Sequence, residues 1–301
     1  MPLNEIEQHP YLDYFITYNN NNVDWAKYNK MIIGSFPVYG ITETIYPYSD
    51  KRHLECSMQM PFFYGSQTNE FWSHLVKAID DRQWISANNP KDTRNLAIKY
   101  LEQHGILLTD VISRTNRFAM KDDLPSPFST DDSALLNLSA ERHVVDQFAL
   151  NQDVIDWLIK AVNIDSLYFT AQGLSGKTPG GWFHQILNRH NIEFEVLYQS
   201  SNAMKYRMRL NDRIRVFKLF YLPTPSSYRS LAFTIGRQHP MFVNYLMSHH
   251  PTFYQSVVAN NFDLDKTKKS MLTSHRNTFI QLWWKQYLLR QNVYFDGSVY
   301  S

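Results

Sequence analysis

The sequence has one cysteine, Cys56, among 301 residues. A single thiol cannot form an internal disulfide, and it cannot supply the several thiolates of a structural zinc site or an iron–sulfur cluster. Uncharged apolar runs of about 18 residues are also missing, as are the basic and apolar regions of a leader peptide at the N-terminus. We therefore expect a soluble, cytoplasmic protein that does not span a membrane.

An excess of charge of one sign is missing too. Thirty Lys and Arg residues stand against 28 Asp and Glu residues, which gives a formal net charge of +2. Such a chain has no global field that marks a polyanion as its partner, so any nucleic-acid surface has to be a local patch. The chain shows no internal repeat and no flexible linker, and we expect a single domain over residues 1–301.

Several catalytic signatures are absent. There is no His-Glu-x-x-His or Gly-x-Ser-x-Gly, and the histidines show no ligand-like spacing beyond the adjacent His249 and His250. One segment, from Ala171 to Thr178, nearly matches a phosphate-binding loop. Ala171 replaces its first glycine, however, and Pro179 falls where its helix should begin. We therefore expect no metal and no cofactor, and we do not favour nucleotide hydrolysis.

Short apolar segments alternate with segments of helical periodicity. Buried strands are predicted at residues 31–35, directly after Gly105, and at 166–170; helices are predicted at 69–81, 96–104, 153–161 and 182–188. This alternation predicts an α/β fold with a mainly parallel sheet, followed by a mostly helical C-terminal part after Tyr228. Sites in such sheets form at the carboxyl ends of the strands.

Two strand ends lead into loops of proline and small residues. They are Gly34-Ser-Phe-Pro37 and Leu222-Pro-Thr-Pro-Ser-Ser227. Proline fixes the backbone and small residues admit a ligand close to it, so each loop could aim N–H groups or hydroxyls at a bound molecule. The alternative is that both are ordinary strand exits.

A β-hairpin is predicted around the turn Asn211-Asp212. Basic and apolar residues alternate on both sides of this turn, which predicts one apolar and one basic face. The basic residues are Lys205, Arg207, Arg209, Arg213 and Arg215. This face has the composition of a phosphate-binding surface, with Arg207 and Arg213 as candidate DNA contacts. The alternative is a solvated face that protects an edge strand from aggregation.

Six motifs occur in the order seen in the uracil-DNA glycosylase superfamily. They are Ile33-Gly-Ser-Phe-Pro37, Phe62-Phe-Tyr-Gly-x-x-x-Asn69-x-Phe-Trp72, Gly105-Ile-x-Leu-x-Asp110-Val, Ser129 followed by Asp131 or Asp132, Tyr168-Phe-Thr170 and Leu222-Pro-Thr-Pro-Ser-Ser227. The chain most resembles the branch of hypoxanthine-DNA glycosylases and mismatch-specific uracil glycosylases. The resemblance covers residues 31–230 and leaves residues 1–30 and 231–301 as extensions.

This resemblance implies a three-layer α/β/α sandwich around a short parallel sheet, and an enzyme that acts on DNA. Its reaction is metal-independent hydrolysis of the N-glycosidic bond of a flipped-out, deaminated or damaged base, of the uracil or hypoxanthine class. The first loop, with Gly34, Ser35, Phe36 and Pro37, is expected to hold water and base. The second, with Pro223, Thr224, Pro225, Ser226 and Ser227, is expected to enter the minor groove, with Arg229 on a phosphate.

The position of the catalytic asparagine differs between this sequence and one branch of that family. Phe36 stands where the mismatch-specific branch has the asparagine that orients the water. In the hypoxanthine-type branch, an asparagine of the Asn-x-Phe-Trp motif resembles the catalytic one, so we favour Asn69. Its amide can accept from and donate to a water or a base. The alternative is that Asn69 caps the following helix.

The same motifs supply candidate base-binding residues. Phe62, Phe63 and Tyr64 could stack on a flipped base, and Thr170 ends a strand of the site. The three aromatic rings could equally belong to the core. For Asp110, at the end of a predicted strand, we expect a structural role.

The substitution at position 36 also motivates a second hypothesis for the function. A member of the superfamily could keep the fold and bind nucleic acid or a nucleobase without cleaving it. We expect a monomer in either case.

Overall fold

The computed structural model describes residues 7–35, 60–65, 69–115, 149–171, 178–200, 202–223, 240–259 and 269–289. The chain divides into two compact units. The sheet unit comprises Met1–Gln67 and Ser86–Tyr221, and the helical unit comprises Thr68–Ile85 and Leu222–Ser301. Residues 7–28 belong to the sheet unit, and the helix after Asn69 belongs to the helical unit.

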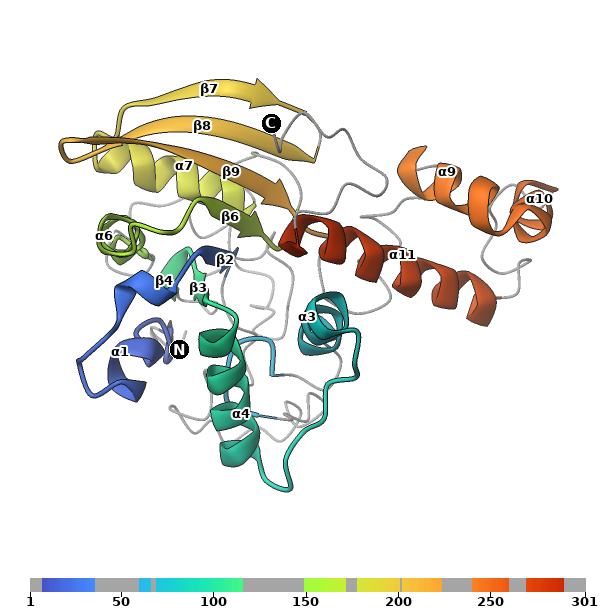
Figure 1. Ribbon diagram of the computed structural model, residues 1–301, viewed down its shortest axis with the longest axis horizontal. Coiled ribbons are helices and arrows are strands. Elements are labelled where there is room, and N and C mark those ends of the chain that lie inside the picture. The colour runs from blue at the N-terminus through green and yellow to red at the C-terminus, as the bar shows by residue number, and fades with distance from the viewer. Residues whose placement is uncertain are drawn as a thin grey trace, which may run out of the picture. The chain divides into compact units, whose positions relative to one another are not determined.

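A six-stranded, mainly parallel sheet confirms the predicted α/β class (Figure 1). Its strand order is β3-β2-β6-β9-β8-β7. The parallel strands are β3 (Ile106–Asp110), β2 (Lys30–Gly34), β6 (Ser166–Phe169) and β9 (Arg213–Tyr221). The antiparallel strands β8 (Ala203–Leu210) and β7 (Phe194–Gln199) extend the sheet beyond β9. The strands β3, β2 and β6 are short apolar runs because both faces of this part of the sheet are covered.

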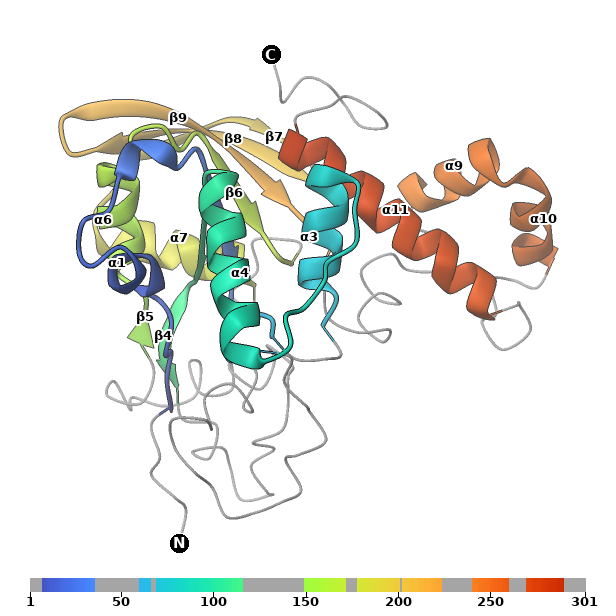
Figure 2. The same ribbon diagram turned by 60° about the horizontal axis from the view of Figure 1, so that its bottom comes forward.

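Helices cover both faces of the sheet. The chain moves from β2 to β3 in one direction along the sheet and from β3 to β6 in the other, so right-handed crossovers place their helices on opposite faces. Figure 2 shows α4 (Pro90–Gln103) on one face and α6 (Asp153–Lys160) and α7 (Pro179–Arg189) on the other. This arrangement is the expected α/β sandwich.

The N-terminal residues are built into the sheet unit. Strand β1 (Glu7–Gln8) pairs with β4 (Ile112–Thr115), which pairs with β5 (Ala149–Leu150) in a small antiparallel sheet. Helix α1 (Tyr14–Tyr18) and the 3₁₀ turn η1 (Trp25–Lys27) follow. Phe15 of α1 is fully buried, with its ring edge-on to Trp157 of α6 at 5.1 Å between centroids.

Two helices begin earlier than the periodicity predicted. The Asn89 side chain accepts from the backbone N–H of Asp92, and the Thr178 side chain accepts from that of Gly181. In each case the capping residue is followed by a proline at the first helical position, where a missing N–H costs nothing. Gly105, with φ 62°, lies just beyond the end of α4 as predicted.

The described helices of the helical unit are α3 (Phe71–Asp80), α9 (Pro240–His249), α10 (Pro251–Ala259) and α11 (Lys269–Leu289). Trp284 of α11 is buried, lies edge-on to Phe71 of α3 at 5.5 Å, and donates from Nε1 to the carbonyl of Pro223 at 3.3 Å. Trp283 is also buried, so both tryptophans of this pair pack in the core of the helical unit. None of the described helices combines the length and apolarity that a membrane crossing requires.

Candidate functional site

The candidate site lies where the parallel strands of the sheet unit end. In the register of β2 and β3, Gly34 is level with Asp110, and β6 ends at Phe169, next to Thr170. Strand β9 ends at Tyr221 at the same edge of the sheet, separated from β2 only by β6. The strands that precede the two loops singled out by the sequence therefore end at the same edge of the sheet, about 10 Å apart at the usual strand spacing.

Gly34 is required at its position by what surrounds it. A Cβ atom at this residue would collide with the hydroxyl of Tyr64 and with Oδ1 of Asp110. The carbonyl of Gly34 accepts from the N–H of Val111 at 3.0 Å, which holds its backbone against the end of β3. The hydroxyl and the carboxylate oxygen thus converge on the space that the missing side chain leaves.

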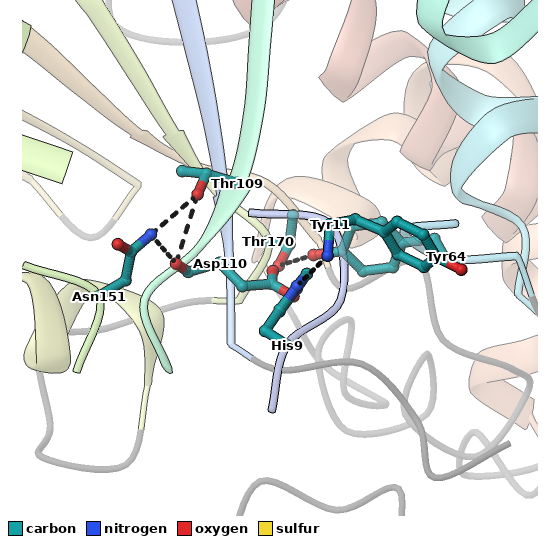
Figure 3. Close-up of polar contacts among 7 residues, drawn as sticks. All are labelled: His9, Tyr11, Tyr64, Thr109, Asp110, Asn151 and Thr170. Atoms are coloured by element: carbon teal, nitrogen blue, oxygen red, sulfur yellow. Dashed lines mark hydrogen bonds and ion pairs between the residues drawn. The ribbon is translucent and has the colours of Figure 1, made fainter. Parts of the chain in front are cut away.

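Asp110 forms a buried pair with His9. Asp110 is 3% exposed, and its Oδ2 lies 2.9 Å from Nε2 of His9 (Figure 3). Nδ1 of His9 accepts the backbone N–H of Tyr11 at 3.1 Å. The other carboxylate oxygen, Oδ1, is buried and has no hydrogen-bond partner among the described residues. A buried polar atom without a partner is rare in proteins and calls for an explanation.

The backbone at Asp110 is also held. Asn151 donates from Nδ2 to the carbonyl of Asp110 at 3.0 Å and to the hydroxyl of Thr109 at 3.2 Å (Figure 3). Asn151 is 2% exposed. These bonds leave the end of β3 little freedom to move, which keeps the carboxylate at one place beside Gly34.

Tyr64 and Thr170, both predicted to bind the base, are brought together. The hydroxyl of Tyr64 lies 3.0 Å from Oγ1 of Thr170, which is 5% exposed (Figure 3). Tyr64 adopts a left-handed φ of 55°, unusual for an aromatic residue, and this turn aims its ring at the strand ends. Thr170 is fixed by a bond from its N–H to the carbonyl of Ile33 at 3.1 Å.

This arrangement has a definite chemistry. An unpaired carboxylate oxygen accepts a hydrogen bond from water or a ring N–H, and in a buried site it can also take up a proton. A neighbouring hydroxyl can donate to a carbonyl. The site therefore suits a small polar molecule with donors and acceptors side by side.

Phe62 and Phe63 do not present their rings to this site. They are 0% and 1% exposed, and both pack edge-on to Tyr14 at 5.0 and 5.8 Å. Phe63 also lies 4.8 Å from the ring of His9. The structure thus uses both rings for packing, which is the alternative that the sequence left open, and of the three predicted aromatic residues Tyr64 is the one whose hydroxyl contacts Thr170.

Asn69 lies in the helical unit, directly before α3. Its Oδ1 accepts from the backbone N–H of Phe71 at 2.9 Å, so it does help to start this helix. The formal N-cap is Glu70, which makes no such bond. The Asn69 side-chain amide nitrogen has no partner among the described residues and remains able to donate.

Other predicted site residues lie beside the cluster or outside the described part. Ser35 is half-buried, and its carbonyl accepts from Ile112 at 3.1 Å. Pro223 is buried in the helical unit. The remaining predicted positions lie outside the described residues: Phe36, Pro37, Thr224, Pro225, Ser226, Ser227 and Arg229.

The prediction of a single basic face on the hairpin is wrong. Across the two-residue turn, Arg207 pairs with Val216 and Leu210 pairs with Arg213, so Arg207 and Arg213 lie on opposite faces. Arg209 pairs with Ile214, which is 57% exposed. The face that carries Lys205, Arg207 and Arg209 is therefore mixed.

Three arginines of the hairpin, Arg207, Arg209 and Arg215, already have partners. On the outer face, Arg207 forms an ion pair with Glu195 at 2.6 Å, and Arg209 forms one with Glu193 at 3.1 Å. On the inner face, the Arg215 guanidinium donates to the carbonyls of Leu158 and Ile164 and, at 3.3 Å, of Ala161. Burial lowers the pKa of Arg215. This residue caps the end of α6 and is not available to DNA.

Sequence reasoning missed His9 and Asn151. Both lie far from Asp110 in the chain, by 101 and 41 residues, and neither stands in a recognisable motif. No group of three or more His, Cys, Asp or Glu residues in the described ranges is arranged to hold a metal ion.

With this geometry established, the chain was compared with protein-family models, curated proteins and solved structures, and none of the three comparisons found a match.

Proposed function

We propose that the protein is a DNA glycosylase-like hydrolase that removes a flipped-out deaminated or damaged base of the uracil or hypoxanthine class, without a metal. One observation carries the proposal. Asp110 keeps a buried, unpaired carboxylate oxygen at the carboxyl ends of parallel strands, among residues that the glycosylase-like motifs independently mark. That placement is where ligands bind in open α/β sheets.

The chemistry of the reaction fits this group. The C1′–N bond breaks and its electron pair leaves with the base, while a water oxygen bonds to C1′ of an oxocarbenium-like sugar. A carboxylate next to that carbon stabilises its positive charge and accepts the proton that the water releases. Asp110 is assigned this role, in place of the structural role expected from the sequence.

The neighbours of Asp110 would hold the base. The hydroxyls of Tyr64 and Thr170 lie 3.0 Å apart, and hydroxyl groups of this kind can donate to the carbonyl of a base. Gly34, without a side chain, allows the base to approach the backbone at the end of β2. Ring carbonyls next to ring N–H groups are common to uracil and hypoxanthine.

Asn69 keeps its proposed catalytic role through the amide nitrogen. Its Oδ1 is engaged by the N–H of Phe71, so we assign the free Nδ2–H₂ to a hydrogen bond with the leaving base or the water. Asn69→Ala should abolish cleavage and leave the fold and most of the DNA affinity intact. If this variant still cleaves, Asn69 has no catalytic role and serves only to start the following helix.

The partner in this proposal is DNA with a damaged or mismatched base, bound by a cytoplasmic monomer. The second loop, from Pro223 to Ser227, would support the extruded nucleotide. The second hypothesis is binding of nucleic acid or a nucleobase without cleavage. It is favoured by the occupied Oδ1 of Asn69 and by Phe36, which has no amide to orient water.

A cleavage assay separates the two hypotheses. Duplex and single-stranded oligonucleotides with one uracil, hypoxanthine or normal base are incubated with the wild type and with Asp110→Asn, and abasic sites are revealed by alkali. We expect cleavage at one damaged base, with a loss of about 10²–10⁴-fold in Asp110→Asn. Retained affinity without any abasic product overturns the enzyme and leaves the binding protein. If the protein yields no abasic product and also does not bind the oligonucleotides, both hypotheses are wrong.

A further inference from the structure

His9 lies outside residues 31–230, the segment that resembles glycosylases, whereas its partner Asp110 lies inside that segment. We propose that His9 is a positioning residue: its Nε2–H fixes the Asp110 carboxylate so that Oδ1 stays an unpaired acceptor beside Tyr64. This inference rests on the proposed function and deepens it, since it makes the N-terminal segment part of the site.

The proton of His9 is placed by its two neighbours. The N–H of Tyr11 donates to Nδ1, so Nδ1 carries a lone pair and the ring proton is on Nε2. Nε2 then donates to Oδ2 of Asp110 at 2.9 Å. The imidazole is neutral in this arrangement and acts as a one-directional donor to the carboxylate.

A carboxylate held at one oxygen keeps the other in place. If Oδ2 were released, the group could rotate about its Cβ–Cγ bond and turn Oδ1 away from Gly34. The His9 side chain is fully buried and that of Asp110 nearly so, at 0% and 4% exposure, so water does not compete for the bond between them. The titratable side chains that the described residues place beside this carboxylate include His9 and Tyr64.

Attachment of the N-terminus does not require this pair. Strand β1 is already held on β4 by its own ladder, with Glu7 opposite Thr115, and the N–H of His9 donates to the carbonyl of Ser113 at 2.8 Å. A side chain used only as an anchor gains nothing from burying a polar pair, which a well-packed apolar contact would replace at no loss. Anchoring therefore does not explain why His9 and Asp110 form a buried polar pair, whereas the need to hold Oδ1 in position does.

Two substitutions separate the hydrogen bond from packing. His9→Gln keeps an N–H donor near the position of Nε2, whereas His9→Phe keeps a ring against Phe63 and removes the donor. His190→Phe, just after α7, is the matched control outside the site. We expect His9→Phe to lower kcat roughly 10- to 100-fold, the effect of losing a hydrogen bond to a charged group, with KM nearly unchanged. His9→Gln should recover most of that loss.

A second measurement does not depend on activity. The ¹³Cγ chemical shift of Asp110, assigned by its absence in Asp110→Asn, is compared between the wild type and both His9 variants at pH 7.5. The shift should change in His9→Phe, because the carboxylate loses its hydrogen-bond donor, and should stay close to that of the wild type in His9→Gln. The ¹⁵N signals of His9 in the wild type should show a protonated Nε2 and an unprotonated Nδ1.

The outcomes distinguish this inference from the proposed function. If the wild type cleaves no base, the proposed function fails, and the carboxylate chemical shift and the ring signals alone decide the role of His9. An Asp110 ¹³Cγ chemical shift that is the same in all three proteins, or a ring protonated on Nδ1, overturns the inference. So does His9→Phe with full activity. If His9→Phe does not fold, His9→Gln and the wild-type ring signals still give the answer.

Discussion

The strand-end cluster and the hairpin β8–β9 use their charged groups in opposite ways. At the strand ends, Asp110 is 3% exposed and keeps one oxygen without a partner among the described residues. On the hairpin, Arg207 and Arg209 are about half exposed and each is paired with a glutamate. An exposed ion pair contributes little to stability, whereas a buried unpaired oxygen is destabilising unless something uses it. The difference predicts that the cluster carries function and that the hairpin carries structure.

The largest effect should follow from filling the space at Gly34. In Gly34→Ala the new methyl group collides with the Tyr64 hydroxyl and with Oδ1 of Asp110, so both must move. We expect at least a hundredfold loss of cleavage, because small displacements of a reacting group are that damaging. Overpacking should also lower the free energy of unfolding by about 1–3 kcal/mol. Cleavage rates and urea unfolding measure the two effects.

Leu96→Ala is the control for this change, because Leu96 is 44% exposed on α4 and away from the strand ends. It should alter neither quantity appreciably. If Gly34→Ala cleaves at the wild-type rate, Asp110 Oδ1 does not need its present position, and the contrast between cluster and hairpin disappears.

The next effect separates the two faces of the hairpin. Arg215→Lys keeps the charge but cannot reach the carbonyls of Leu158, Ala161 and Ile164 together, since an ammonium lacks the planar fork of a guanidinium. Leaving such acceptors unpaired should cost about 1–3 kcal/mol of unfolding free energy. Arg207→Lys on the outer face should change it by less than about 0.5 kcal/mol.

Another variant on the outer face, Arg207→Ala, tests whether the hairpin contacts DNA. Because Arg207 is already paired with Glu195, Arg207→Ala should leave the slope of DNA affinity against salt concentration nearly unchanged. If the magnitude of this salt slope falls by about one in Arg207→Ala, Arg207 exchanges its glutamate for a phosphate, and the outer face of the hairpin is part of the DNA-binding surface.

Much of the fold could be predicted from local pattern. The apolar runs that became β2, β3 and β6 and the helical periodicity of α3 and α6 were recognisable because each depends only on neighbours in the chain. Helix starts were missed where a cap and a proline extended the helix beyond its apolar residues, as at Asn89. The Asn89-Pro90 pair is itself a signal for a helix start, but it lies outside the apolar periodicity that predicts the helix at 96–104.

The prediction of one basic face is wrong because it assumed that the alternation of basic and apolar residues keeps the same face on both sides of the turn. In a two-residue hairpin, residues equidistant from the turn pair and share a face, so Arg209 matches Ile214 and not Arg213. The two-residue turn Asn211-Asp212 is therefore enough to predict which residues of the hairpin share a face. His9 is a different case, because its bond to Asp110 spans 101 residues and no local pattern announces it. Contacts of that kind depend on the whole topology.

The smallest effect concerns pH and the inner face of the hairpin. His184 of α7 lies 2.6 Å, through Nε2, from the hydroxyl of Tyr206 on β8, and burial lowers the pKa of His184 below its ordinary value of 6.5. The unfolded chain then takes up a proton before the folded chain does, so the unfolding free energy rises with pH in this range. The contribution is fully present above about pH 6.5 and is lost as the pH falls through the folded-state pKa.

Urea unfolding at pH 7.5 and pH 5.5 tests this for the wild type and His184→Gln, which keeps a polar side chain but does not titrate. The loss of stability on acidification should be smaller in the variant than in the wild type. Because His184 lies far from Asp110 in the chain and on the helix-covered face of β8, cleavage by the variant at pH 7.5 should equal that of the wild type. A variant that keeps the wild-type acid sensitivity but loses cleavage would reverse the assignment of structure to the hairpin and function to the strand ends.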